Sequence, residues 1–92
     1  MATNRPLHYL KRKDIGKIYP IGDSSISKYL NEIEKSGRYP DGSIIRMAGG
    51  SMLVLDTVIH DYLQNRWKLI HGVKVEPYSA EETVRQMKRL AI

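Results

Sequence analysis

Cysteine is absent from this chain of 92 residues, which excludes disulfides and thiolate-bound metal sites. No apolar run approaches the ~20 residues that a membrane-spanning helix needs, and the first residues lack the apolar block of a secretory signal. We therefore expect a cytoplasmic protein without membrane contact. The chain also contains no internal repeat and no low-complexity tract. Because a chain this short can fill only one hydrophobic core, the sequence predicts a single domain.

Positive charge is unevenly distributed along the chain. The net charge is +5, from 15 Lys and Arg residues and 10 Asp and Glu residues. Residues 1–17 hold five basic and one acidic side chain, whereas residues 41–66 hold two basic and three acidic ones. Net charge alone supports nucleic-acid binding only weakly, but such clustering is typical of a surface that contacts phosphates.

The apolar spacing predicts a short helix over residues 11–19 and a longer one over residues 23–35. Pro20 is expected to end the first helix, because proline lacks an N–H and disfavours helical geometry in the residue before it. Asp23 or Ser24 is expected to cap the second helix. The residues expected to face inward are Ile15, Ile18, Tyr19, Ile21, Ile26, Tyr29, Leu30 and Ile33.

Glycines and a proline shape this helix pair. Gly16 is expected where the two helices cross, because their close packing requires a small residue, and Gly37 is expected to close the second helix. The turn position that usually holds glycine in such a pair holds Pro20 here, with Gly22 two residues later. The sequence therefore predicts a wider turn than usual.

A β-hairpin is predicted next, from the short apolar runs 43–47 and 52–55 on either side of Ala48-Gly49-Gly50-Ser51. Asp56 is expected to cap a third helix, and Asp61 is expected on its surface. The side chains expected on the inner face of that helix are Val58, Ile59, Tyr62, Leu63 and Trp67, the last as an anchor for the final helix. A capping box formed by Ser79 and Glu82 predicts the start of this final helix, whose apolar stripe is Val84, Met87 and Leu90.

The order of helix, turn, helix, hairpin and helix predicts a mainly α fold with a small β-hairpin, the winged helix-turn-helix. We assign residues 1–67 to this domain, beginning with an irregular or short extended arm over residues 4–9. Residues 68–92 are expected to form a connector and a C-terminal helix that either packs on the domain or mediates self-association.

From Tyr9 to Arg66 the chain resembles the AlpA/excisionase-type winged helix-turn-helix proteins of phages and mobile elements, which also resemble the DNA-binding head of MerR regulators. The matching stretches are LKRKDI at residues 10–15, SSISKYL at 24–30, SGRYP at 36–40 and VLDTVIHDYL at 54–63. The resemblance implies sequence-specific binding of double-stranded DNA by an excisionase or a small transcriptional regulator. It also implies cooperative self-association on DNA and an integrase or recombinase as a partner.

In helix-turn-helix motifs the N-terminal residues of the second helix reach the edges of the bases. The exposed positions of the second predicted helix are therefore predicted to contact DNA. These positions are Ser24, Ser25, Ser27, Lys28 and Asn31. The basic residues of the first helix are predicted to contact phosphates, and they are Lys11, Arg12, Lys13 and Lys17. The residues predicted to enter the neighbouring minor groove are Arg46 and the hairpin tip Gly49, Gly50 and Ser51.

Other kinds of site have little support in the sequence. His8, His60 and His71 share no metal-ligand spacing, and no catalytic set is recognisable, so we expect no enzyme, metal or cofactor. Two alternatives stay open. One is a protein-interaction adaptor that uses the last helix and the wing, and the other is a replication or partition protein that binds repeated DNA sites.

Overall fold

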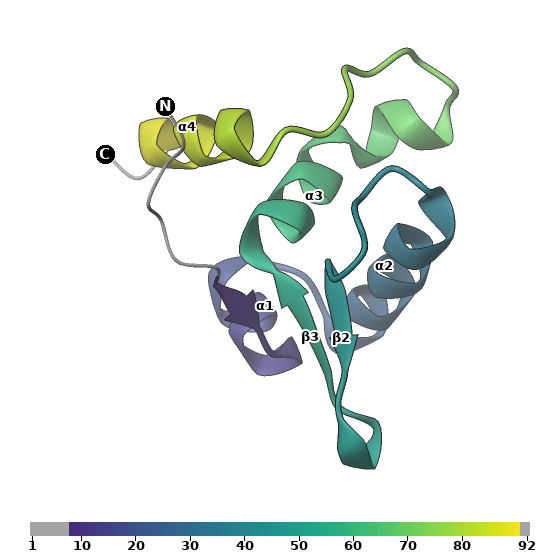
Figure 1. Ribbon diagram of the computed structural model, residues 1–92, viewed down its shortest axis with the longest axis vertical. Helices are drawn as coiled ribbons and strands as arrows, with labels where there is room; N and C mark the ends of the chain where they lie inside the picture. The colour runs from purple at the N-terminus through teal and green to yellow at the C-terminus, as the bar shows by residue number, and fades with distance from the viewer. Residues whose placement is uncertain (1–7, 91–92) are drawn as a thin grey trace.

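The structure, a computed structural model, describes residues 8–90, with side chains described as far as residue 87. Within this part of the chain, four helices surround a small antiparallel sheet (Figure 1). The elements in chain order are β1 (Tyr9–Leu10), α1 (Arg12–Ile18), α2 (Asp23–Ser36), β2 (Ile44–Arg46), β3 (Met52–Leu55), α3 (Asp56–Ile70) and α4 (Ala80–Leu90). This is a mainly α, winged helix-turn-helix fold, as the order of the sequence patterns predicts.

The sheet has three strands in the order β1-β3-β2, one more than the predicted hairpin. In the hairpin, Ile44 pairs with Val54 and Arg46 with Met52, so that β2 and β3 are antiparallel. The added strand β1 pairs with the other edge of β3 through Tyr9 and Leu10. Two residues are too short a run to show a strand periodicity, which explains why the sequence indicated only an extended arm; the rest of that arm lies outside the described residues.

The hairpin tip is a single 3-10 turn, Ala48–Gly50, and it projects away from the helices (Figure 1). Gly49 and Gly50 have φ angles of 84° and 86°, in the left-handed region that side chains with a Cβ rarely adopt. The N–H of Met47 donates to the carbonyl of Ser51 at 2.8 Å and closes the turn. The predicted role of the two glycines in a tight hairpin is confirmed.

One hydrophobic core joins the helices to the sheet. Its buried members are Ile15, Ile26, Leu30, Ile33, Val54, Val58, Ile59 and Tyr62, and Tyr19, Ile21 and Tyr29 pack against it. The predicted inner stripe of α2 is therefore confirmed. Two predictions about the core are wrong: Ile18 is 57% exposed and Trp67 is 66% exposed. Tyr19 and Leu69, which follow them closely in the chain, pack against the core, so Ile18 and Trp67 lie on other sides of their helices.

The helix starts differ from the predicted caps. Gly22 is the N-cap of α2, and Leu55 is the N-cap of α3. Asp56 is instead the first residue of α3 and is buried. Asp61, which we expected on the surface, is also buried, because Arg38 from the loop after α2 covers it with an ion pair at 2.9 Å.

Gly16 is not required by close packing. A Cβ built at this position would lie 3.7 Å from Cδ1 of Ile26, an ordinary van der Waals distance. A residue as large as alanine therefore fits at this position, against Ile26 of α2.

The C-terminal helix α4 packs against α3, and Thr83 and Val84 are buried there. Half of the predicted capping box is present, since the hydroxyl of Ser79 accepts a hydrogen bond from the N–H of Glu82 at 3.3 Å. The connector before α4 is also attached, because the hydroxyls of Tyr78 and Thr57 are 2.7 Å apart. No helix within residues 8–90 is long and apolar enough to cross a membrane.

Candidate nucleic-acid interface

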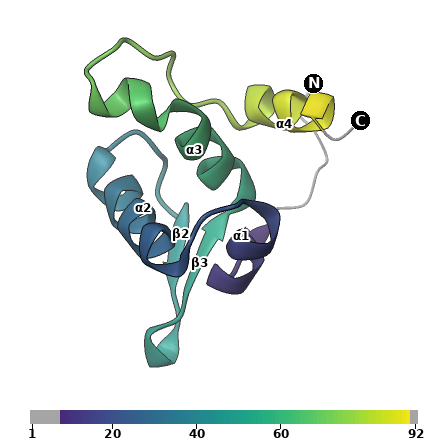
Figure 2. The same ribbon diagram turned by 180° about the vertical axis from the view of Figure 1, so that it is seen from behind.

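The helices α1 and α2 both begin on the side of the molecule from which the β2–β3 hairpin projects (Figures 1 and 2). The turn between them spans residues 19–22. The N–H of Ile21 donates to the carbonyl of Tyr19 at 2.8 Å and closes a three-residue turn around Pro20. One end of the molecule therefore carries the first turns of both helices and the wing.

Helical spacing divides the surface of α2 into three faces. Ser24, Lys28 and Asn31 follow one another at intervals of three or four residues, opposite the buried stripe, and all three are exposed. Within residues 8–87, the side chains of this outer face of α2 form no hydrogen bond or ion pair with a neighbouring element. It is the face that can enter a groove.

Ser27 and Ser25 lie on opposite flanks of α2. Ser27 is seven residues before Glu34, and both contact arginines from α1 or the wing. Ser25 is seven residues before Glu32, whose carboxylate faces α3. Since residues seven apart share a helix face, the structure separates Ser25 from the other predicted DNA contacts.

Arg12 joins the first turn of α1 to the first turn of α2. Its Nη2 donates to the backbone carbonyl of Asp23 at 3.1 Å and lies 3.3 Å from the carboxylate of the same residue. The same nitrogen donates to the hydroxyl of Ser27. Both Arg12 and Ser27 are partly buried, so these two predicted contacts are already partners of each other.

The lysines around α2 are placed differently from Arg12. Lys11, Lys13, Lys17 and Lys28 are exposed, and within residues 8–90 their ammonium groups form no ion pair with a carboxylate. Asp14 stabilises the basic start of α1, since its carboxylate accepts the N–H of Lys11 at 3.1 Å. The unpaired positive charge of this surface therefore comes from lysines.

A groove of about 510 Å³ runs between the start of α1 and the wing. Its lining residues are Lys11, Arg12, Lys13, Met47, Ser51, Met52 and Leu53. Met47, which is 49% exposed, was not predicted as a site residue, because nothing in the sequence distinguishes it from a core methionine of the hairpin. The groove joins a cationic rim to an apolar floor, a combination suited to the sugar-phosphate backbone.

Arg46, predicted to enter the minor groove, is paired in the structure. Its Nη2 lies 2.5 Å from Oε1 of Glu34, and its Nη1 lies 3.6 Å from the sulfur of Met52. Sequence reasoning missed Glu34, although its spacing of seven from Ser27 could have placed it on the wing-facing flank of α2. Within residues 8–87, the exposed wing tip, Gly49 to Ser51, forms no ion pair or other side-chain contact of this kind.

A second ion pair fixes α2 from the opposite flank. The carboxylate of Glu32 accepts hydrogen bonds from Arg66 at 2.9 and 3.1 Å, and another from the hydroxyl of Tyr62. The hydrogen bond from Arg66 is the main cause that lowers the pKa of Glu32. The guanidinium also lies 4.5 Å from the centre of the Tyr29 ring. These contacts set the orientation of α2 relative to α3.

Buried polar contacts also hold the loop that follows α2. Asp61 accepts hydrogen bonds from both Arg38 and the hydroxyl of Tyr39, the latter at 2.7 Å. Burial, together with the hydrogen bond to Asp61, raises the pKa of Tyr39.

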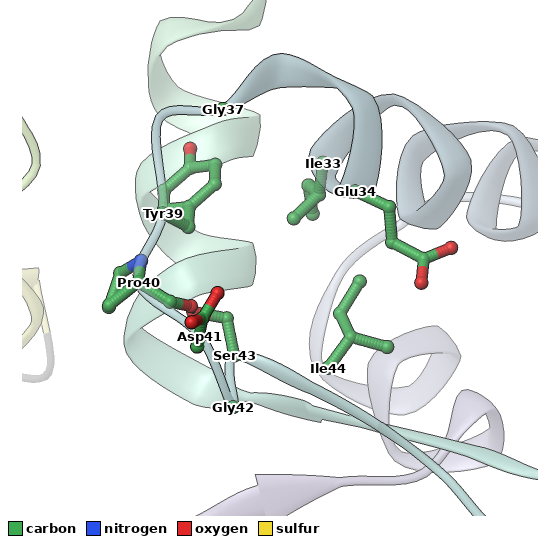
Figure 3. A pocket seen from close by; sticks show the side chains of 9 residues that line it. All are labelled: Ile33, Glu34, Gly37, Tyr39, Pro40, Asp41, Gly42, Ser43 and Ile44. Carbon is green, nitrogen blue, oxygen red and sulfur yellow. The ribbon is translucent and has the colours of Figure 1, made fainter.

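A hollow of about 170 Å³ lies nearby, between Ile33 and Glu34 of α2 and residues 40–44 (Figure 3). Its charged lining residues are Glu34, which pairs with Arg46, and the exposed Asp41, and we assign the hollow no ligand.

A further groove, of about 410 Å³, lies on the side of α3 that faces the α1–α2 turn. Its lining includes Pro20 and two exposed apolar side chains, Trp67 and Ile70.

The histidines do not converge on a metal site: within the described residues, no three His, Asp or Glu side chains are grouped to hold an ion. His60 instead lies 3.1 Å from the hydroxyl of Tyr19 through Nδ1.

Comparisons of the chain with protein-family models, with curated proteins and with solved structures found no match.

Proposed function

We propose that this protein binds double-stranded DNA, with α2 in the major groove and the wing beside the adjoining backbone. The observation that carries this proposal is the outer face of α2, where Ser24, Lys28 and Asn31 form an exposed polar row, together with the exposed lysines of the adjacent α1. An α-helix with its side chains is about 10–12 Å wide, and the major groove is about 12 Å wide, so the helix fits.

Each residue of the interface has a role that follows from its chemistry. Asn31 can pair with both the N6 and N7 atoms of adenine, and Lys28 can reach the acceptors of guanine. Ser24, in the first turn of α2, lies where the helix dipole favours a phosphate. Lys11, Lys13 and Lys17 supply phosphate contacts, and the backbone of the wing tip can approach the DNA closely because Gly49 and Gly50 have no side chains.

The biological setting that we propose is a mobile element, in which the protein acts as an excisionase or a small transcriptional regulator. This part of the proposal rests on the sequence resemblance between Tyr9 and Arg66. A single small domain reads only a few base pairs, so several copies bound side by side, and an integrase or recombinase as a partner, would supply the remaining specificity. Footprinting on DNA of the element would test it; protection of one isolated site would contradict cooperative binding.

The DNA-binding proposal is tested by fluorescence anisotropy with random-sequence duplexes over a range of salt concentrations. Each phosphate contact contributes a slope of about −0.9 to the plot of log K against log salt. Lys13→Ala should therefore bind more weakly and reduce the slope by about one. The matched control is Lys74→Ala, in the connector beside a different groove, which should leave the slope unchanged. A wild-type protein without salt-dependent affinity for any duplex would refute the proposal.

A protein-interaction adaptor is the second candidate function, and the groove beside Trp67 favours it. Exposed apolar side chains that line a groove are typical of protein contacts, and Trp67 and Ile70 are 66% and 53% exposed. This surface differs from the last helix and wing that the sequence analysis assigned to an adaptor. Partner binding that Trp67→Ala abolishes, together with absence of DNA affinity, would favour this function over DNA binding.

A further inference from the structure

The wing-facing flank of α2 carries a carboxylate on a surface that we propose meets DNA. Glu34 extends from α2 toward β2 (Figure 3). Its Oε1 lies 2.5 Å from Nη2 of Arg46, and the two side chains are 32% and 62% exposed. A pair this close, joining α2 to the end of β2, ties the wing to the helix.

An unpaired carboxylate at this position would repel the phosphates of a bound duplex. The guanidinium of Arg46 cancels that charge, so the pair as a whole adds no net charge to the surface. Its Nη1 also lies 3.6 Å from the sulfur of Met52, a weak acceptor on β3. Arg46 therefore contacts a side chain of α2 and a side chain of β3. Within residues 8–87, the ammonium groups of Lys11, Lys13 and Lys17 form no ion pair with a carboxylate.

We propose that Arg46 is a positioning residue: it neutralises Glu34 and fixes the wing against α2, and it does not itself contact the DNA. This inference rests on the proposed DNA binding and deepens it, because it assigns the phosphate contacts to the lysines. It replaces the expectation that Arg46 enters the minor groove. The role of Arg46 is thus to make the surface around Glu34 compatible with a polyanion.

The test uses Arg46→Gln, Glu34→Gln and the double variant, each titrated with duplex DNA over a range of salt concentrations. Arg46→Gln exposes the carboxylate and should weaken binding by about fivefold, the size expected for a charge pair at the surface. The double variant removes both charges. It should bind within about twofold of the wild type and keep the wild-type salt slope, because no phosphate contact has been lost.

The opposite result is equally clear. If Arg46 contacts a phosphate, the double variant should remain as weak as Arg46→Gln, and its salt slope should fall by about one. That outcome would overturn the inference while leaving the proposed DNA binding intact. A wild-type protein that fails to bind any duplex would overturn both proposals, so the two failures are distinguishable.

A matched control separates specific pairing from general charge compensation. Lys28→Gln combined with Glu34→Gln changes the net charge by the same amount, but the ion-pair partner of Glu34 is Arg46, and Lys28 lies on the outer face of α2. We expect this variant to stay weak, because the guanine contact proposed for Lys28 is lost. Rescue of Lys28→Gln by Glu34→Gln would contradict the specific role of Arg46. Thermal unfolding of each variant verifies that the fold is retained.

Discussion

Arg12 donates a hydrogen bond from Nη2 to the backbone carbonyl of Asp23 at 3.1 Å, which fastens the first turn of α1 to the first turn of α2. The same nitrogen donates to Ser27 and lies 3.3 Å from the Asp23 carboxylate. One side chain thus fixes the relative position of the two helices that form the helix-turn-helix unit. A planar guanidinium can make these contacts together, and a lysine ammonium cannot reproduce their geometry.

Arg12→Lys is therefore expected to keep the charge of the surface and to lose stability. The lost hydrogen bonds should cost about 1 kcal/mol, which corresponds to a fall in Tm of about 4–8 °C for a domain of this size. Thermal unfolding followed by circular dichroism measures the change. Lys13→Arg, at an exposed and unpaired position, is the control and should unfold at the wild-type temperature. An unchanged Tm for Arg12→Lys would mean that Arg12 is simply a phosphate contact.

The faces of α2 predict which of its polar residues read bases. Asn31→Ala should weaken binding to a duplex selected from a random library by about 1–3 kcal/mol and should affect scrambled duplexes much less. Ser25→Ala should bind both duplexes like the wild type, because Ser25 shares its flank with Glu32 and faces α3. Gel-shift titrations measure both variants. A larger specific loss for Ser25→Ala than for Asn31→Ala would show that α2 enters the groove on a different face.

The sequence predicted those parts of the fold that depend on local patterns. Ile26, Leu30 and Ile33 recur at helical spacing and are buried, and the Gly49-Gly50 pair has the positive φ angles of a tight turn. The helical spacing and the glycine pair each involve residues that are close together in the sequence, so both features can be predicted from one sequence alone. The same holds for the exposed outer face of α2, which is the complement of its apolar stripe.

Relationships between distant segments could not be predicted in this way. The burial of Asp61 depends on Arg38, which is 23 residues away, and the wing pair joins Arg46 to Glu34, which is 12 residues away. Trp67 was expected inside because it continues the spacing of α3, but Leu69, two residues later, packs against the core, so the exposed Trp67 lies on another side of the helix. Periodicity gives the direction of a side chain around a helix, and it does not say where the neighbouring elements stop.

His60 predicts a dependence of stability on pH near neutrality. Burial lowers its pKa below the ordinary value of 6.5, and Asp61 and Asp56 oppose this shift. The folded state therefore binds fewer protons than the unfolded state, so its stability is complete above pH 6.5 and falls as the pH drops below that value. The slope for one proton cannot exceed about 1.4 kcal/mol per pH unit.

Urea unfolding of the wild type and of His60→Gln between pH 5 and 7.5 measures this contribution. Glutamine can still accept the hydrogen bond from Tyr19, and it does not titrate. We expect the wild type to lose stability more steeply than the variant as the pH falls. His71→Gln is the control, because His71 is exposed. Parallel curves for the wild type and His60→Gln would rule out His60 as the group responsible.

Glu32 predicts a separate loss of stability in acid. The hydrogen bond from Arg66 is the main cause of its lowered pKa, so the carboxylate stabilises the fold above its ordinary pKa of 4.5. This contribution is lost as the pH falls through the lowered value. Glu32→Gln should cost about 1–2 kcal/mol at pH 7, because Arg66 and Tyr62 lose a charged acceptor.

The stability curves of the wild type and Glu32→Gln should approach each other as the pH falls below about 4.5. Chemical unfolding at pH 7, 5 and 3.5 makes the comparison. Glu81→Gln, at an exposed position in the first turn of α4, serves as the control for the loss of one negative charge. A constant difference between wild type and Glu32→Gln at all three pH values would show that the ion pair with Arg66 does not depend on the charge of Glu32.

Two glycines, one in α1 and one at the wing tip, should respond oppositely to alanine. Gly16 lies inside α1, and a Cβ there would meet Ile26 at an ordinary 3.7 Å, so Gly16→Ala should raise the free energy of unfolding by about 0.5–1 kcal/mol. Gly49 has a φ of 84°, and Gly49→Ala should lower it by about 1 kcal/mol, because a Cβ strains that backbone conformation. Urea unfolding gives both values. A destabilised Gly16→Ala would restore the close helix crossing that the sequence suggested, and an unchanged Gly49→Ala would mean that the wing tip can adopt another turn.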